Sequence, residues 1–120
     1  MESQAGEGGL PLSLVAHDGG EPLGTVSLIF DDLPGFTHLN PWLAGLYVLP
    51  AHREKGVATA LVREAERRFV EAGHHEAWLF TESARPLFET LGWKFFQEAT
   101  CHGHPVVILR KNLAPLRTTS

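Results

Sequence analysis

Apolar residues in the first half of this chain fall into short runs that predict β-strands. Leu12–His17 alternates between apolar and polar side chains and ends at Asp18–Pro22, whose glycines and proline indicate a turn. Leu23–Phe30 is rich in apolar and β-branched residues, so the two runs predict a hairpin. Trp42–Leu49 is nearly all apolar, which is typical of a central strand covered on both faces, and Pro50 ends it.

A helical period follows the third strand. Four apolar residues recur at every fourth position, namely Val57, Leu61, Ala65 and Phe69. This spacing places them on one face of a helix, and Gly73 stands just past its expected end. On the opposite face the pattern places the charged residues Arg63, Glu66, Arg67 and Glu71, and Glu64 and Arg68 form an i,i+4 pair.

The last third of the chain repeats this alternation of strand and helix. Ala77–Thr81 predicts a short strand, and Ala84–Leu91 predicts a helix with Ser83 as its N-cap and Gly92 as its end. A second hairpin is expected from two further strands, Phe95–Thr100 and Val106–Arg110.

The predicted order of elements is therefore ββ-β-α-β-α-ββ, a mixed sheet of the α/β (α+β) class. A helix joins the strands Trp42–Leu49 and Ala77–Thr81, so these two strands are expected to be parallel, with a right-handed connection.

Composition narrows the possible classes of protein. With 120 residues the chain predicts one domain, 1–120, with a flexible lead-in at 1–11 and a flexible tail at 114–120. The net charge of −4 and the lack of a basic stripe argue against nucleic acid and anionic membranes as partners. The apolar runs are too short for a membrane span. One cysteine and the absence of a signal-peptide pattern favour a cytoplasmic location.

The most informative motif is Arg-x-x-Gly-x-Ala at Arg53–Ala58, between the apolar strand and the long helix. The first N–H groups of a helix have no intrahelical partner, and the helix dipole favours an anion there. Gly56 lets phosphate oxygens approach the backbone closely. The motif lacks the Gly-Lys-Ser/Thr of a Walker loop and the three glycines of a dinucleotide fingerprint, so it predicts a different kind of pyrophosphate seat.

Two blocks of sequence resemble the GNAT superfamily of N-acetyltransferases. Leu46–Val62 resembles the segment in which those enzymes hold acetyl-CoA at Gln/Arg-x-x-Gly-x-Gly/Ala. Thr81–Trp93 resembles their Ala-x-x-Leu-Tyr-Glu-x-Leu-Gly-Phe segment. The blocks stand in the family's order and spacing, and the resemblance covers about residues 12–113.

The resemblance implies a site for acetyl-CoA in a gap between the two parallel strands, which splay apart. The pantetheine arm would pair with the backbone of Leu46, Tyr47 and Val48, where an amide would face the thioester carbonyl. The pyrophosphate would lie on the backbone of Arg53, Glu54, Lys55, Gly56, Val57, Ala58 and Thr59, with the Arg53 and Lys55 side chains either assisting or remaining solvated. Thr81 and Phe88 occupy positions where many members have asparagine and tyrosine. The implied activity is direct transfer of an acetyl group to a primary amine of a small-molecule or protein acceptor.

Two departures from the family pattern leave a second function open. Phe88 cannot protonate the leaving thiolate as a tyrosine can. Only about eleven residues precede Leu12, so the usual N-terminal strand and helices, which wall the acceptor site, are expected to be missing. A non-catalytic acetyl-CoA-binding module or sensor is the alternative, and a chance match in an unrelated α/β domain is a third. The exposed edge of the first hairpin predicts a homodimer.

The general base is weakly specified by sequence. Deprotonation of an alkylamine needs a base or a water chain, and His38, Asp32 and Glu82 are the main candidates. Asp31 and Tyr47 are weaker ones. Trp42, Trp78 and Trp93 are expected in the core or in a pocket wall, and Trp42, at the strand entrance, is also a candidate for stacking on the acceptor. Cys101 lacks a nucleophile motif, and His102 and His104 lack further ligands, so no metal site is predicted.

Overall fold

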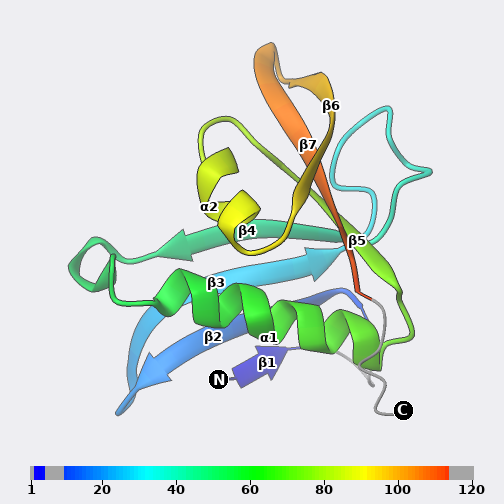
Figure 1. The fold of residues 1–120 in the computed structure, drawn as a ribbon. Coiled ribbons are helices and arrows are strands. Elements are labelled where there is room, and N and C mark those ends of the chain that lie inside the picture. Colours follow the sequence, from blue (N-terminus) through cyan, green and yellow to red (C-terminus); the bar gives the residue numbers. More distant parts are fainter. Residues whose placement is uncertain (1, 5–9, 114–120) are drawn as a thin grey trace.

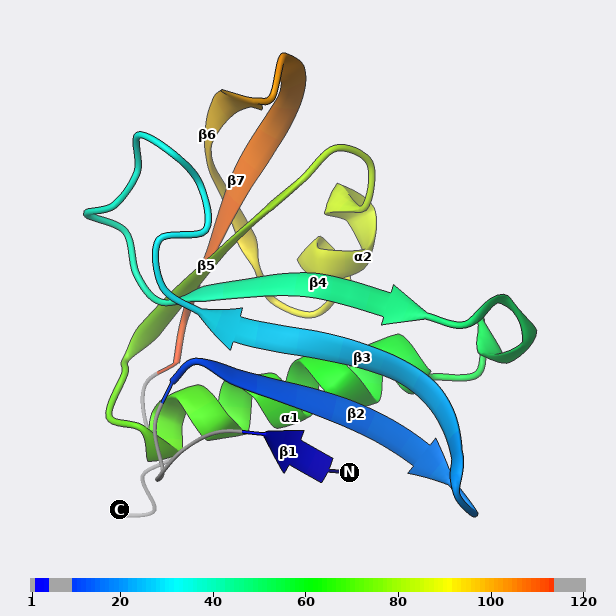
Figure 2. The ribbon, with the colours of Figure 1, turned by 180° about the vertical axis from the view of Figure 1, so that it is seen from behind.

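The computed structural model describes residues 2–4 and 10–113, which fold into one seven-stranded sheet with two helices on one face (Figures 1 and 2). The strand order is β1-β2-β3-β4-β5-β7-β6, and only β4 and β5 are parallel neighbours. The strands are β1 Glu2–Gln4, β2 Leu12–Asp18, β3 Glu21–Ile29, β4 Trp42–Val48, β5 Glu76–Thr81, β6 Lys94–Cys101 and β7 His104–Asn112. The helices are the 3₁₀ turn η1 Pro50–His52, α1 Val57–Glu71 and α2 Arg85–Thr90.

The predicted order of elements is confirmed, with one strand added. β1 lies inside the predicted lead-in and pairs with Ser13–Val15 of β2, so β2 does not form the edge of the sheet along that stretch. β1 consists of Glu2, Ser3 and Gln4, none of which is apolar, which is why the apolar pattern did not reveal this strand. Residues 1 and 5–9 of the lead-in, and the predicted tail 114–120, lie outside the described residues.

The main core lies between α1 and the sheet. α1 buries Leu61, Val62, Ala65 and Phe69 against the inward side chains of β2, β3 and β4, as its apolar stripe predicts. Gly73 follows the helix end with φ of 94°, a conformation that suits glycine. Glu66 departs from the prediction, because its side chain is only 13% exposed and pairs with Lys111 of β7.

A smaller core lies on the other face of the sheet, under the loop between β3 and β4. It contains Leu33 and Leu39 from that loop, Trp42 from β4, and Trp78 and Ile108 from β5 and β7. The Trp42 indole is fully buried and donates its Nε1–H to the Leu39 carbonyl. Trp42 is therefore a core residue, as expected for the tryptophans, and its ring is not free to stack on an acceptor.

β4 and β5 diverge from a single point of contact. In the described part of the chain their ladder consists of one residue pair, Trp42 and Trp78, next to the bond from the Trp78 N–H to the Pro41 carbonyl. The register between β3 and β4 shifts beside Gly45, whose φ is 62°, which is the pattern of a β-bulge. Gly45 and Tyr47 are exposed, so the prediction that this strand is covered on both faces fails for its second half. β4 is central in the sheet, but its second half borders the gap between β4 and β5.

Candidate functional site

The gap between the diverging strands holds a pocket of about 250 Å³. Its walls come from both strands and from both faces of the sheet. The lining residues are Asp32 of the β3–β4 loop, Leu43, Ala44, Gly45 and Leu46 of β4, Leu79, Phe80 and Thr81 of β5, and Ala84 and Phe88 at α2. All of these but Asp32 and Thr81 present apolar side chains or glycine, and Asp32 is the only ionisable residue among the described lining. An apolar channel beside strand backbone suits an extended, largely uncharged arm.

The segment after β4 forms an open anion seat at the start of α1. Gly56 is the N-cap residue, with φ of 84°, and no side chain caps the helix. The first backbone bond of the helix runs from the Ala60 N–H to the Gly56 carbonyl at 3.0 Å, so the N–H groups of Val57, Ala58 and Thr59 precede it. A Cβ atom added at Gly56 would meet nothing within 4 Å. Gly56 therefore adds no crowding where a phosphate group would approach the start of the helix.

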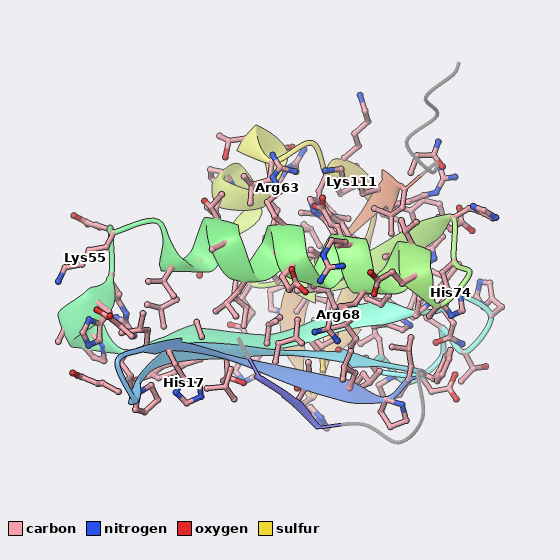
Figure 3. The ribbon with its side chains drawn as sticks, turned by 90° about the horizontal axis from the view of Figure 1, so that it is seen from below. His17, Lys55, Arg63, Arg68, His74 and Lys111 are labelled. Atoms are coloured by element: carbon pink, nitrogen blue, oxygen red, sulfur yellow. The ribbon has the colours of Figure 1, made fainter. Side chains whose placement is uncertain are left out.

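The two basic side chains of this segment behave differently. The Arg53 Nε–H donates to the Val48 carbonyl at 2.9 Å, and its guanidinium lies 5.6 Å from the centre of the Tyr47 ring. Lys55 extends away from the body of the protein at the turn before α1, and it makes no side-chain contact among the residues the structure describes (Figure 3). Of the two, only Lys55 is free to move toward a bound phosphate. The adjacent Glu54 is exposed and has φ of 62°.

Thr81 and Phe88 line the pocket from the α2 side. The Thr81 hydroxyl accepts hydrogen bonds from the Ala84 N–H at 3.0 Å and the Ser83 N–H at 3.3 Å. Ser83 makes no cap bond and α2 starts at Arg85, so the prediction of Ser83 as N-cap is wrong. Phe88 is 4% exposed and packs edge-on against Trp93, with 6.2 Å between ring centres. Its ring closes the apolar end of the pocket.

Of the candidates for general base, Asp32 is the one that reaches this pocket. Burial raises the pKa of the Asp32 carboxyl above its ordinary value of 3.8, which makes its carboxylate a stronger base. His38 is exposed and stacks on Phe36 in the same loop, with 6.1 Å between ring centres. Asp31 accepts a hydrogen bond from Asn40 at 3.0 Å, and its own N–H donates back to Asn40, so it closes the loop.

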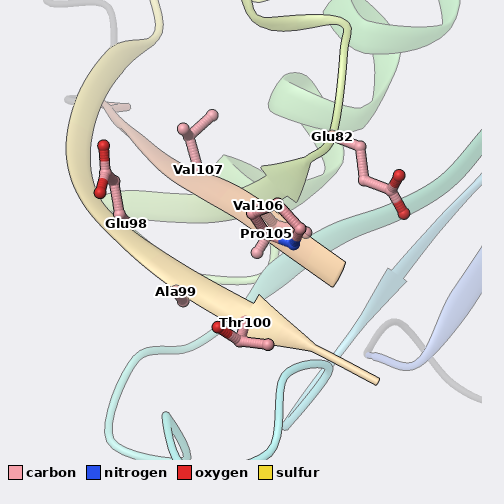
Figure 4. Close-up of a pocket in the computed structure, with 7 residues that line it drawn as sticks. All are labelled: Glu82, Glu98, Ala99, Thr100, Pro105, Val106 and Val107. Atoms are coloured by element: carbon pink, nitrogen blue, oxygen red, sulfur yellow. The ribbon is translucent and has the colours of Figure 1, made fainter. Parts of the chain in front are cut away.

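Glu82 and Tyr47 do not line the pocket. Glu82 borders a separate hollow of about 490 Å³ against the β6–β7 hairpin, opposite Glu98 (Figure 4). Tyr47 is 48% exposed, with its ring beside the Arg53 guanidinium. The backbone of Leu46, Tyr47 and Val48 nevertheless runs along the edge of the gap, where the ladder to β5 has ended.

The structure adds several pocket residues that the sequence did not single out, including Leu43, Ala44, Gly45 and Leu79. Gly45 carried a usable signal, because a glycine inside an apolar strand often marks a bulge. Residues 2–4 and 10–113 contain no group of three His, Cys, Asp or Glu side chains arranged to hold a metal ion. Neither helix in the described residues is long and apolar enough to cross a bilayer.

The sequence and the fold of the chain match those of known proteins. The sequence profile of the acetyltransferase (GNAT) family matches residues 3–93. An aminoglycoside 6′-N-acetyltransferase solved with coenzyme A superposes with a TM-score of 0.72 and 18% identity, over 88% of this chain and 74% of that one. The structure of yncA from Salmonella typhimurium, solved with its cofactor acetyl-CoA, superposes with a TM-score of 0.70 and 18% identity. The superposition covers 92% of this chain and 69% of that one.

A short stretch is also similar to a curated protein. It is 68% identical over 25 residues to aminoglycoside N(6′)-acetyltransferase type 1 of Acinetobacter haemolyticus. This match spans 21% of the chain and 17% of that relative.

Proposed function

Because the chain belongs to the acetyltransferase (GNAT) family, we propose that it moves an acetyl group from acetyl-CoA directly to a primary amine of a small-molecule acceptor. The observation that carries this proposal is the pocket in the β4–β5 gap together with the open N-terminus of α1, the helix that follows β4 in the chain. An apolar channel followed by an anion seat fits the two parts of coenzyme A, a pantetheine arm and a pyrophosphate. The names of the similar aminoglycoside acetyltransferases support a small-molecule amine as the acceptor.

The residues of the chain divide the chemistry as follows. Backbone N–H groups of Arg53 to Thr59 hold the pyrophosphate, and the backbone at Leu46 to Val48 holds the arm and polarises the thioester carbonyl. Bound acetyl-CoA supplies the activated acetyl group. Asp32 takes a proton from the acceptor ammonium, which frees the lone pair of the nitrogen for attack. A C–N bond forms, the C–S bond breaks, and the attacking nitrogen loses its second proton to solvent, which leaves a neutral amide and the coenzyme A thiolate.

The leaving thiolate has no phenol to protonate it at the position of Phe88. A thiol has an ordinary pKa near 8.5, so its thiolate leaves without assistance from a side chain and takes a proton from solvent. Asp32 then passes its proton to solvent. Phe88 thus contributes shape to the pocket and leaves the chemistry to Asp32 and the strand backbone.

Thermal denaturation with and without acetyl-CoA tests binding, because a ligand that binds only the native state raises Tm. Thiol release over a panel of amines, including aminoglycosides and short alkyl diamines, tests transfer. Binding together with amine-dependent thiol release is expected. No shift of Tm with acetyl-CoA or coenzyme A would contradict the whole proposal.

A non-catalytic acetyl-CoA-binding module is the second candidate, and Phe88 is the residue that favours it. It predicts that acetyl-CoA raises Tm while no amine in the panel releases thiol. Replacing Asp32 with asparagine would then change neither measurement.

A homodimer and a cytoplasmic location are further parts of the proposal. The exposed sheet edge that motivates the dimer is now β1 and the remainder of β2, because β1 pairs with Ser13–Val15. Sedimentation of a monomer at micromolar concentration would contradict the dimer. The single cysteine, Cys101, is free, as is usual in a reducing compartment.

A further inference from the structure

The side chain of Arg53 is bound to the strand that precedes it. Two contacts hold it there, the bond from its Nε–H to the Val48 carbonyl at 2.9 Å and the stacking of its guanidinium on Tyr47 at 5.6 Å. Both partners belong to the last two residues of β4. Arg53 itself lies three residues before Gly56, the N-cap of α1. The arginine therefore spans the junction between the strand that borders the gap and the turn that forms the anion seat.

The adjacent residue is tied down in another direction. The His52 Nε2 atom lies 3.0 Å from the Glu21 carboxylate at the start of β3. The side chains of His52 and Arg53 thus fasten one end of the turn to β3 and β4. The other end is fixed by α1, whose apolar face is buried. Between these points, Glu54 and Gly56 hold left-handed backbone conformations, which only a well-supported turn maintains.

We propose that the Arg53 side chain has a positioning role: it holds the anion seat in register with β4 and does not contact the phosphates, whereas the Lys55 side chain supplies the mobile positive charge. This rests on the proposed binding of coenzyme A. Arg53 uses its Nε–H and one face of its guanidinium on β4, while Lys55 has no partner among the described residues and extends from the turn. Lysine cannot replace arginine in this role, because its ammonium group has neither a planar face to stack on Tyr47 nor an Nε–H to donate to the Val48 carbonyl.

The geometry also explains an aromatic residue at an exposed position. Tyr47 is 48% exposed on a strand whose other large apolar residues are covered. Its ring forms the platform on which the guanidinium rests, so its loss should have the same consequence as loss of the arginine. The two effects should not add, because each substitution breaks the same connection.

Isothermal titration of coenzyme A against single variants at two ionic strengths tests this assignment. Arg53→Lys and Arg53→Gln should both weaken binding by about tenfold, although only the second removes a charge. Tyr47→Leu should weaken binding, and the double variant Tyr47→Leu with Arg53→Gln should bind about as well as Arg53→Gln alone. Lys55→Gln should weaken binding at low salt, and the difference from wild type should shrink at high salt because salt screens exposed charges.

Arg67→Gln, on the exposed face of α1, is the control for net charge and should bind like wild type. Melting temperatures show whether each variant is folded at the titration temperature. Wild-type affinity in Arg53→Lys, or a salt dependence that is lost in Arg53→Gln, would overturn the positioning role and indicate a direct phosphate contact. If the wild-type protein itself failed to bind coenzyme A, the proposed function would be refuted. If the wild-type protein bound coenzyme A and substitution of Arg53 left the affinity unchanged, only the positioning role would be refuted.

Discussion

Removing the Glu66 carboxylate should destabilise this protein far more than its place on the outer side of α1 suggests. The carboxylate accepts a hydrogen bond from the Trp93 indole at 3.1 Å and pairs with the Lys111 ammonium at 3.1 Å and the Arg63 guanidinium at 3.2 Å. The Glu66 and Lys111 side chains are only 13% and 18% exposed. One side chain thus joins the long helix to β7 and to Trp93, the residue just before β6.

The size of the effect follows from these exposures. A hydrogen bond to a charged group that is largely shielded contributes roughly 1.5–3 kcal/mol, whereas an exposed ion pair contributes about 0–1 kcal/mol. Glu66→Ala removes the shielded bonds to Trp93 and Lys111 and leaves the ammonium with the Leu91 carbonyl as an acceptor. We expect the free energy of unfolding to fall by about 3 kcal/mol. For a domain of this size, that lowers Tm by roughly 10–20 °C.

Thermal and urea denaturation of Glu66→Ala and Glu71→Ala at neutral pH provide the measurement. Glu71 lies on the same helix and also pairs with an arginine, but Glu71 and Arg67 are 56% and 55% exposed. The expected loss for Glu71→Ala is therefore within about 1 kcal/mol. Equal losses in the two variants would refute the reasoning, because they would show that shielding from solvent does not set the strength of these pairs.

Three further outcomes are expected. Asp32→Asn should lower kcat by about 10²–10⁴-fold while acetyl-CoA still raises Tm. Because burial raises the pKa of the Asp32 carboxyl, the variant should also be more stable than wild type at neutral pH. This difference in stability should vanish as pH falls through the raised pKa toward 3.8. Gly24→Ala should cost roughly 1–3 kcal/mol in urea denaturation, since its Cβ would lie 2.6 Å from the Tyr47 carbonyl oxygen, and an unchanged midpoint would contradict this. Gly56→Ala should weaken coenzyme A binding more than tenfold, because the left-handed backbone at this residue costs alanine roughly 1–2 kcal/mol and the added methyl group faces the open seat. Wild-type affinity in this variant would argue against a phosphate at this seat.

Much of the fold could be predicted from the sequence because its signals are local. The stripe from Val57 to Phe69 and the ends at Gly73 and Gly92 depend on periodicity and backbone preference within one element. The position of β7 between β5 and β6 is different, since it depends on which strands meet in space. The strand β1 was missed because its three residues, Glu-Ser-Gln, carry no apolar signal.

The site was less predictable than the fold, because the folding of loops and contacts with residues distant in sequence determine which side chains reach it. Asp32 and His38 lie in one loop, and only the folding of that loop directs Asp32 to the pocket and leaves His38 outside. Arg53 is equally suited by its type to bind phosphate or to stack on Tyr47, and sequence does not show which contact it makes. The hydrogen bonds that the Thr81 hydroxyl accepts from the Ser83 and Ala84 N–H groups were not predicted, since they depend on how the loop before α2 folds against the end of β5.

The single pair of residues that joins β4 to β5 has a consequence for amide hydrogen exchange. Beyond Trp42 and Trp78 the facing edges of the two strands have no ladder partners in the described part of the chain, so alternate amides at Ala44 to Val48 should exchange with solvent deuterium within seconds to minutes. An occupant that pairs with this edge would slow their exchange, while amides that bond to β3 would change little. Hydrogen exchange in the peptides that contain β4 therefore reports whether the gap is occupied, without an attached label or a known acceptor.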